Sequence, residues 1–213
     1  YFPEGFLIDV GGSGIFADKN INYILGFLNI KITNFLLQVI NPTMNFTEGT
    51  LSALPIIFPS DNSIKQKIDT LTQENIDISK GEWDSRETSW DFKINELIKH
   101  KDDSNKLDVA YNNYCKYWKE KFFRLHKNEE ELNQLFIDIY DLNDELDNKV
   151  PLTEITILKE ESEIKNDQLV FKKEVLVKQF LSYIVGCIFG RYNPEKKGLL
   201  LANQGETITD FPI

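Results

Sequence analysis

The chain has 213 residues, 41% of them hydrophobic and 27% charged, which is typical of a globular protein with one large or two small domains. Its net charge of −10 argues against a simple DNA-binding domain, because Lys and Arg contacts to phosphates supply much of the affinity in such domains. No apolar run approaches the roughly 18 residues of a membrane-spanning helix, so we expect no membrane protein.

The charge is unevenly spread. Residues 1–58 contain 2 Lys or Arg against 4 Asp or Glu, residues 59–150 contain 14 against 21, and residues 151–213 contain 8 against 9. The acidic character is therefore concentrated in the middle, and the two ends are the better surfaces for DNA. The chain starts at Tyr1 with neither Met nor a leader sequence, so we interpret it as a piece of a longer protein.

The first segment, residues 1–17, predicts a strand, a glycine turn and the approach to a helix. Its stretch 7–14, Leu-Ile-Asp-Val-Gly-Gly-Ser-Gly, also has features of the loops that bind S-adenosylmethionine, where glycines let the backbone approach the ligand. The spacing from the acid to the glycines is one residue short of that pattern, and no Asn/Asp-Pro-Pro-Tyr/Phe motif follows. We favour a plain glycine turn.

Residues 21–40 predict one amphipathic helix. Apolar residues recur at steps of three and four, which indicates a single buried face: Ile24, Leu25, Leu28, Ile32, Phe35, Leu36 and Val39. Asn20 is a suitable N-cap, and the Asn41-Pro42 pair ends the pattern because proline disfavours helical geometry in the residue before it.

Four polar residues in and after this helix are candidates for DNA contact. Lys31 and Asn34 lie on or near its polar side, while Thr43 and Asn45 lie in the turn that follows. Short hydroxyl and amide side chains usually satisfy backbone groups in turns, but they also contact bases and phosphates. Both interpretations remain open.

The middle of the chain predicts mainly helices. An apolar run at 51–59 is followed by a helix over 60–74 capped by Ser60 or Asp61, with Ile64, Ile68 and Leu71 on one face. Between helices, residues 83–92 contain two Trp and a Phe, which favours a packed corner over a base-stacking platform.

A long helix then begins at Ser104 and runs to Lys127, and Asn128 caps a second helix. The apolar stripe of the first comprises Leu107, Ala110, Tyr111, Tyr114, Trp118, Phe122 and Leu125. Basic residues are interleaved with this stripe, namely Lys116, Lys119, Lys121, Arg124 and Lys127. A basic face beside aromatic residues could contact phosphates, but we favour a solvated helix face.

The last third predicts short strands at 151–157 and 169–171 around a charged turn, then a helix over 173–189. The residues of this helix that we expect to face inward are Val175, Leu176, Gln179, Phe180, Tyr183, Ile184 and Cys187. Gly190-Arg191-Tyr192 ends this helix, and the chain from 196 onward predicts a loop with a short apolar stretch. Lys178 and Arg191 are further candidates for DNA contact.

Several stretches resemble one family. The order helix, Asn/Thr turn, Leu54-Pro55-Ile56, then helix is similar to the target-recognition part of adenine-specific DNA methyltransferases and of type I restriction specificity subunits. Residues 82–92 (Glu-Trp-Asp-Ser-Arg-Glu-Thr-Ser-Trp-Asp-Phe), 136–142 and 183–192 resemble the methyltransferases of bacteriophage-exclusion (BREX) defence systems, in matching order over nearly the whole chain.

The resemblance implies a target-recognition region that lies C-terminal to the catalytic core of an adenine-N6 methyltransferase. Since the catalytic motif and a standard S-adenosylmethionine loop are missing, we expect no catalytic residue and no cofactor in this fragment, although the parent enzyme uses S-adenosylmethionine. His100 and His126 are the only histidines and lie far from a second ligand in sequence, so we expect no metal site.

We therefore expect a helix-dominated α+β fold with a recognition-like α/β domain at 1–58, a helical spacer at 59–148 and a C-terminal α/β portion at 149–213. The expected function is DNA target recognition through the parent enzyme, in the cytoplasm, where the isolated Cys115 and Cys187 remain reduced. The alternative is a module that docks onto a protein partner of the same defence machinery, which the acidic middle suits better than it suits DNA.

Overall fold

A computed structural model describes residues 14–41, 47–103, 106–200, 206–207 and 209. As expected, the fold is helix-dominated α+β, with seven α-helices, one 3₁₀ turn and two small antiparallel sheets within those residues. The chain forms two compact units, and each is described by itself. Unit 1 contains residues 1–77 and 125–151, and unit 2 contains residues 78–124 and 152–213.

This division does not follow the sequential ranges 1–58, 59–148 and 149–213. The two long helices explain the difference, because α4 (Asn62–Trp83) and α6 (Leu107–Tyr140) each contribute one part to unit 1 and another to unit 2. The region expected to be a spacer therefore supplies part of the core of both units.

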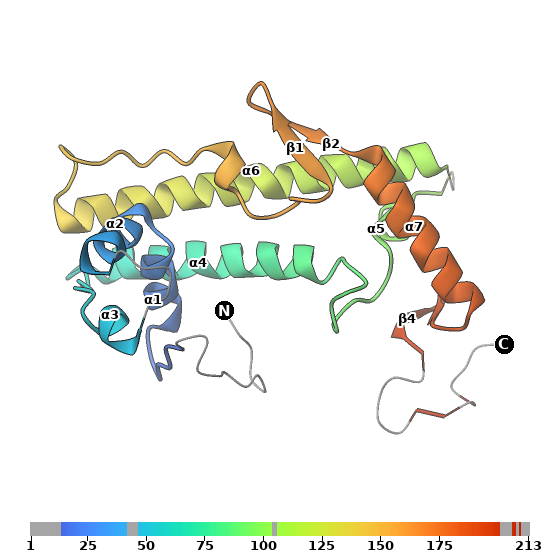
Figure 1. Cartoon of the computed structure of the whole chain (residues 1–213), viewed down its shortest axis with the longest axis horizontal. Coiled ribbons are helices and arrows are strands. Elements are labelled where there is room, and N and C mark those ends of the chain that lie inside the picture. The colour runs from blue at the N-terminus through green and yellow to red at the C-terminus, as the bar shows by residue number, and fades with distance from the viewer. Residues whose placement is uncertain (1–13, 42–46, 104–105, 201–205, 208, 210–213) are drawn as a thin grey trace. The chain divides into compact units, whose positions relative to one another are not determined.

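Unit 1 is built from α1 (Ile21–Leu28), α2 (Lys31–Ile40), the short α3 (Glu48–Ser52) and the facing parts of α4 and α6. Figure 1 shows α1 and α2 in blue beside the start of α4. One apolar core joins these helices. It contains Tyr23, Phe27, Ile30, Ile32, Leu37, Leu54, Ile68, Leu71, Leu132, Phe136 and Ile137.

The prediction of one straight helix over 21–40 is wrong. The axes of α1 and α2 differ by 70°, and Ile30 between them is extended (φ −91°, ψ 162°) and only 2% exposed. The break changes which side faces inward: Phe35 and Val39 are exposed, whereas Tyr23, Phe27 and Leu37 are buried. Asn20 adopts a left-handed conformation and makes no side-chain cap.

Residues distant in sequence support this bend. The buried Asn133 of α6 accepts a hydrogen bond from the backbone N of Lys31 at 3.0 Å, and so caps α2 from another helix. Two tyrosines hold the irregular segment after α3: the Tyr23 hydroxyl donates to the Ile57 carbonyl at 2.6 Å, and the Tyr140 hydroxyl accepts from the Ile57 backbone N at 3.2 Å.

The two helices predicted over 104–140 are one. Asn128, predicted to start the second, lies inside α6 with 1% exposure. Its side-chain amide donates to Glu74 Oε2 and Asn75 Oδ1 of α4, both at 2.9 Å. The predicted N-cap is therefore a buried polar contact between helices.

Unit 2 contains the remaining parts of α4 and α6, the short α5 (Glu96–Lys99), the 3₁₀ turn η1 (Leu152–Glu154), two hairpins and α7 (Lys173–Ile188). The predicted strand at 151–157 is wrong, since the first strand is β1 (Ser162–Lys165), paired with β2 (Gln168–Phe171). Asn166 and Asp167 both have positive φ, as a type I′ turn requires.

Helix α7 is confirmed; its last helical residue is Ile188, and Gly190 follows with φ 73°. The prediction that Ile184 faces inward is wrong, since Ile184 is 36% exposed while Leu176 and Tyr183 are buried. The chain then forms a second hairpin from β3 (Tyr192–Asn193) and β4 (Lys196–Leu199), where we had predicted a loop. In this part of unit 2, the rings of Phe92, Tyr183 and Tyr192 form a small buried cluster.

No single helix among the described residues is long and apolar enough to cross a membrane; α1 and α2 meet the length and composition criteria only when taken together as a bent pair.

Candidate nucleic-acid interface

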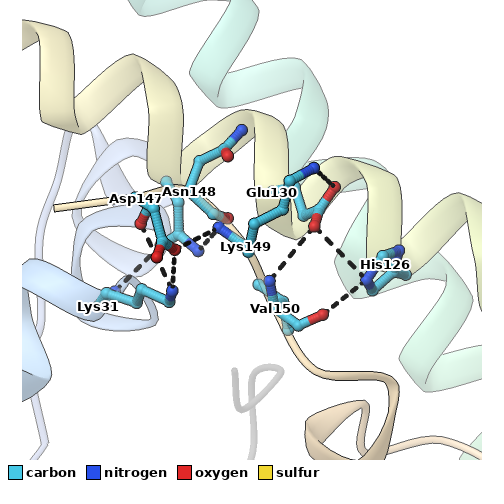
Figure 2. A network of polar contacts seen from close by, with 8 residues as sticks. Lys31, His126, Glu130, Asp147, Asn148, Lys149 and Val150 are labelled. Carbon is cyan, nitrogen blue, oxygen red and sulfur yellow. Dashed lines mark hydrogen bonds and ion pairs between the residues drawn. The ribbon is translucent and has the colours of Figure 1, made fainter. Parts of the chain in front are cut away.

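Lys31, the first predicted DNA contact, carries an ion pair (Figure 2). Its Nζ lies 2.7 Å from Asp147 Oδ1 and donates to the Asp147 carbonyl at 3.4 Å. The hydrogen bond from Lys31 is the main reason why the pKa of Asp147 is lowered. The charge of Lys31 is thus partly compensated within unit 1.

The rest of the network in Figure 2 fastens residues 147–150 to α6. His126 Nε2 lies 2.7 Å from the Val150 carbonyl, and Glu130 accepts from the Val150 backbone N at 3.3 Å. Lys149 Nζ adds a 3.5 Å contact to Glu130. Since each member of the network contacts a neighbour in the same unit, we assign the network to holding the irregular segment 147–150 in place rather than to binding.

The other predicted residues differ in their surroundings. Asn34 is exposed on α2, and Lys178 is exposed on α7. Thr43 and Asn45 lie outside the described residues. Arg191 is exposed directly after α7, with its guanidinium 5.4 Å from the centre of the Tyr192 ring.

Three segments of unit 2 meet at Arg191 and bring basic residues together. The Leu200 backbone N donates to the Arg191 carbonyl at 3.0 Å, and the Gly198 backbone N donates to the Lys93 carbonyl at 2.7 Å. Lys93, Arg191 and Lys197 are all exposed. They come from the segment before α5, the end of α7 and strand β4, and we call them the basic cluster.

Acidic residues also lie around the basic cluster, including Asp91, whose pKa is lowered mainly by the hydrogen bond from Lys80 and also by the charge of Lys93. Lys196, the neighbour of Lys197, is paired with Glu206 at 2.7 Å, and Glu195 lies in the turn of the same hairpin. The basic cluster therefore places three exposed cations among acidic side chains, on a chain whose net charge is −10. Exposed cations attract phosphates over distances of about a Debye length.

Tight packing beneath the basic cluster fixes the positions of its backbone segments. The Phe92 ring meets the rings of Tyr183 and Tyr192 edge-on, with centroids at 6.0 and 5.4 Å. Gly186 of α7 leaves room for Tyr192, because a Cβ there would lie 2.6 Å from Tyr192 Cδ2. Phe92 precedes Lys93 and Tyr192 follows Arg191, so this apolar cluster anchors two of the three cations.

The loop between α4 and α5 presents Trp90 to solvent with 95% exposure. Polar contacts order the loop: Lys80 Nζ pairs with Asp84 at 2.5 Å and Asp91 at 2.7 Å, and Ser89 Oγ donates to Asp84 at 2.8 Å. The predicted packed corner is therefore wrong for the tryptophans, since Trp83 is 54% exposed as well, and right only for Phe92. Charged side chains, not stacked rings, close this loop.

A partly buried guanidinium supports the base of the same loop. Arg86 Nη2 contacts Glu82 Oε1 and lies 3.0 Å from Glu161 Oε2. Burial raises the pKa of Glu82 and outweighs the opposing effects of the hydrogen bond from Leu158 N and of the Arg86 charge. Glu82 also accepts from the Leu158 backbone N at 2.9 Å, and Gln179 donates to Glu161 at 2.8 Å.

The arrangement is suited to binding. Exposed cations and an exposed indole on an ordered loop are groups that contact phosphates and stack on bases. No three His, Cys, Asp or Glu side chains in the described ranges are placed to hold a metal ion.

Sequence reasoning found Arg191 but missed Lys93, Lys197 and the exposure of Trp90. Lys93 and Lys197 are 104 positions apart in the chain, so periodicity gave no signal for their proximity. The aromatic and polar composition of 83–92 was visible, and it was interpreted as packing.

Comparison with known proteins gives the chain a context. No family model matches it. It is 32% identical over 213 residues to the adenine-specific methyltransferase BrxX of Escherichia coli O9:H4 (strain HS), covering 96% of this chain and 17% of that protein. It is 31% identical over 207 residues to the adenine-specific methyltransferase PglX of Lacticaseibacillus casei (strain Zhang), covering 95% of this chain and 16% of that protein.

The chain thus spans about a sixth of the length of the curated relatives that it matches, and along almost all of its own length it is similar to one segment of adenine-specific methyltransferases.

Proposed function

We propose that this chain is the DNA target-recognition segment of an adenine-N6 methyltransferase of a BREX phage-defence system. The observation that carries the proposal is the similarity of nearly the whole chain to one segment of two adenine-specific methyltransferases. The segment acts by selecting the site, and the remainder of the parent enzyme transfers a methyl group to a flipped adenine.

The basic cluster supports a DNA-contacting role. Lys93, Arg191 and Lys197 are held on hydrogen-bonded segments, so their charges are available without a large rearrangement of the backbone. The exposed Trp90 lies three residues from Lys93 and offers a face for stacking. Local positive charge can direct phosphates to this end of unit 2 although the whole chain is acidic.

We further propose that the segment binds no S-adenosylmethionine by itself, because no standard cofactor loop or catalytic motif occurs in its sequence. Residues 7–13 of the closest candidate, the stretch 7–14, lie outside the described residues. Calorimetric titration of the chain with S-adenosylmethionine tests this directly. Micromolar binding that disappears in Gly12→Val would show that the glycine turn is a cofactor loop.

The DNA proposal is tested in the parent methyltransferase with the double variant Arg191→Gln and Lys197→Gln. A matched control is Lys116→Gln with Lys119→Gln, which removes the same charge from exposed positions of α6. Fluorescence anisotropy measures the dissociation constant of a DNA duplex at several salt concentrations. Each lost phosphate contact lowers the slope of log K against log salt by roughly 1.

We expect a smaller salt slope and weaker binding for the first variant and unchanged values for the control. Equal behaviour of the two variants would show that the basic cluster does not contact DNA. If neither variant affects DNA binding or methylation, while neutralising acidic residues between 61 and 147 releases a protein partner, the segment is the docking module instead. The net charge of −10 is the observation that favours this second function.

Asn45 gives a separate test of site selection. We propose that Asn45→Ala relaxes the methylated sequence motif, because one good base contact contributes roughly 1–3 kcal/mol of discrimination. If Asn45 only satisfies its own turn, the variant loses about 1 kcal/mol of stability and methylates the same motif. Sequencing the methylated adenines in cells that carry the variant distinguishes these outcomes.

A further inference from the structure

Helix α7 has two apolar faces. One face packs within unit 2 through Leu176, Tyr183 and Cys187. The other contains exposed apolar residues at helical spacing, namely Leu181, Ile184, Val185, Ile188 and Phe189. We call this second set the outer stripe of α7.

The outer stripe is distinct from the packed face. At about 100° per residue, positions 181, 184, 185 and 188 fall on one side of the helix, roughly a third of a turn from 176, 183 and 187. Exposure along the stripe reaches 75% at Ile188 and 83% at Phe189. Neither apolar cluster described above includes these residues.

A helix with apolar residues on both faces is typical of the interior of a larger protein. Single exposed apolar side chains are common on surfaces, but a contiguous row of five marks an interaction surface. The cost of leaving such a row in water is removed only when a second surface covers it.

We propose that the outer stripe of α7 docks against an apolar surface in the remaining part of the same methyltransferase polypeptide. This inference depends on the proposed function only in taking the chain as a segment of such an enzyme. The extent of the match identifies the occupant: the related methyltransferases have about five-sixths of their length outside the region that corresponds to this chain. That remainder is the nearest source of a covering surface and is present at equal stoichiometry.

The position of the stripe gives the contact a consequence. Phe189 lies two residues before Arg191, so a body that covers the stripe ends beside the basic cluster. Docking through the stripe therefore sets the distance between the DNA-contacting cations and the catalytic part of the enzyme. Small shifts in that distance change which adenine reaches the catalytic site.

Hydroxyl-radical footprinting tests the proposal. Oxidation of Phe189, Ile188 and Leu181 is measured by mass spectrometry in the full methyltransferase without DNA and in the 213-residue chain. Circular dichroism first checks that the chain is helical. Trp90, which is 95% exposed and belongs to another segment of unit 2, is the internal reference.

We expect oxidation of the stripe to fall several-fold in the full enzyme relative to the chain, with oxidation of Trp90 unchanged. Equal oxidation of the stripe in both proteins would overturn the proposal. Protection of the stripe in the isolated 213-residue chain would also overturn the proposal. Protection that increases with chain concentration would mean that a second copy covers the stripe. Protection that is independent of concentration would mean that other residues of the same chain cover it.

A charge variant provides a second readout in the full enzyme. Val185→Lys with Ile188→Lys is expected to restore oxidation of Phe189 and to make the segment easier to release by limited proteolysis. The control Val170→Lys changes an exposed apolar residue of β2 and is expected to do neither. Unaltered protection in the double variant would contradict docking through this stripe.

Adding DNA separates this inference from the proposed function. If Arg191→Gln with Lys197→Gln loses DNA binding but the stripe is not protected in the full enzyme, the docking inference alone is wrong. If the stripe is protected and this variant binds DNA unchanged, the assigned DNA contacts alone are wrong.

Discussion

Replacing Arg86 by Met is the sharpest test of how unit 2 is held together. The variant leaves two carboxylates without their shared cation: the side chains of Glu82 and Glu161 are only 9% and 4% exposed, and that of Arg86 is 18% exposed. Removing one partner of a buried ion pair costs about 3–5 kcal/mol. Glu82 and Glu161 each keep one hydrogen bond, from Leu158 N and Gln179 Nε2, so we expect the lower end, about 3 kcal/mol.

Urea denaturation of the chain, followed by circular dichroism, measures this loss. With an m-value of about 2 kcal/mol per molar urea, the midpoint falls by roughly 1.5 M. The matched control is Lys80→Met, which also breaks two ion pairs, but at a side chain that is 46% exposed. That variant should lose no more than about 1 kcal/mol.

The pH dependence identifies the cause of the loss. Burial already raises the pKa of Glu82 above its ordinary 4.5, and loss of Arg86 raises it further. A raised folded-state pKa stabilises the folded protein at low pH, and this contribution is lost as pH rises through the folded-state value. The loss of unfolding free energy in Arg86→Met should therefore be largest at neutral pH and become smaller as the pH falls toward 4.5. A deficit below 1 kcal/mol, or one that is independent of pH, would refute buried charge as the reason.

Three further substitutions test packing and polar contacts, each by chemical denaturation. Gly186→Ala should cost about 1–3 kcal/mol, because the new Cβ would lie 2.6 Å from the Tyr192 ring; an unchanged midpoint would mean that the ring moves freely. Asn128→Ala should lower the free energy of unfolding by about 1–3 kcal/mol, because two buried hydrogen bonds to α4 are lost. A smaller loss would be the result for a helix cap at a frayed end and would contradict the buried contact. Asn133→Ala should lower the free energy of unfolding by about 1 kcal/mol, because it removes the cap of α2. The control Lys31→Met should lower it less, because the ion pair of Lys31 is exposed. A larger loss in Lys31→Met than in Asn133→Ala would contradict the assigned cap.

Local signals in the sequence predicted much of the helical content. Most of the predicted apolar stripe of α6 is buried, including Tyr114, Trp118 and Phe122, whereas Leu107 at the start of the helix is 43% exposed. Asp61 accepts from the Ser63 backbone N at 2.8 Å at the predicted start of α4, and α7 ends shortly before the predicted glycine. These features depend on neighbours within a turn or two of helix, so a single sequence contains the information for them.

The candidate site was less predictable. The sequence identified Arg191 as a cation at the end of a helix, and it also contained the Asn-Asp turn of the β1–β2 hairpin, which was overlooked. It contained no sign that Lys93 and Arg191 lie on adjoining segments, because hydrogen bonds to β4 bring them together.

The sequence by itself determined the helix-dominated class, the position of α7 and the acidic balance of the chain, all of which follow from composition and short-range periodicity. Tertiary structure alone decided the break at Ile30, the burial of Asn128, the partly buried position of Arg86 and the exposure of Trp90. The first three depend on a partner far away in the chain, such as Asn133 for the start of α2 or Glu161 for Arg86. The free energy of a buried polar group is set by that partner, and no local pattern encodes which residue it will be.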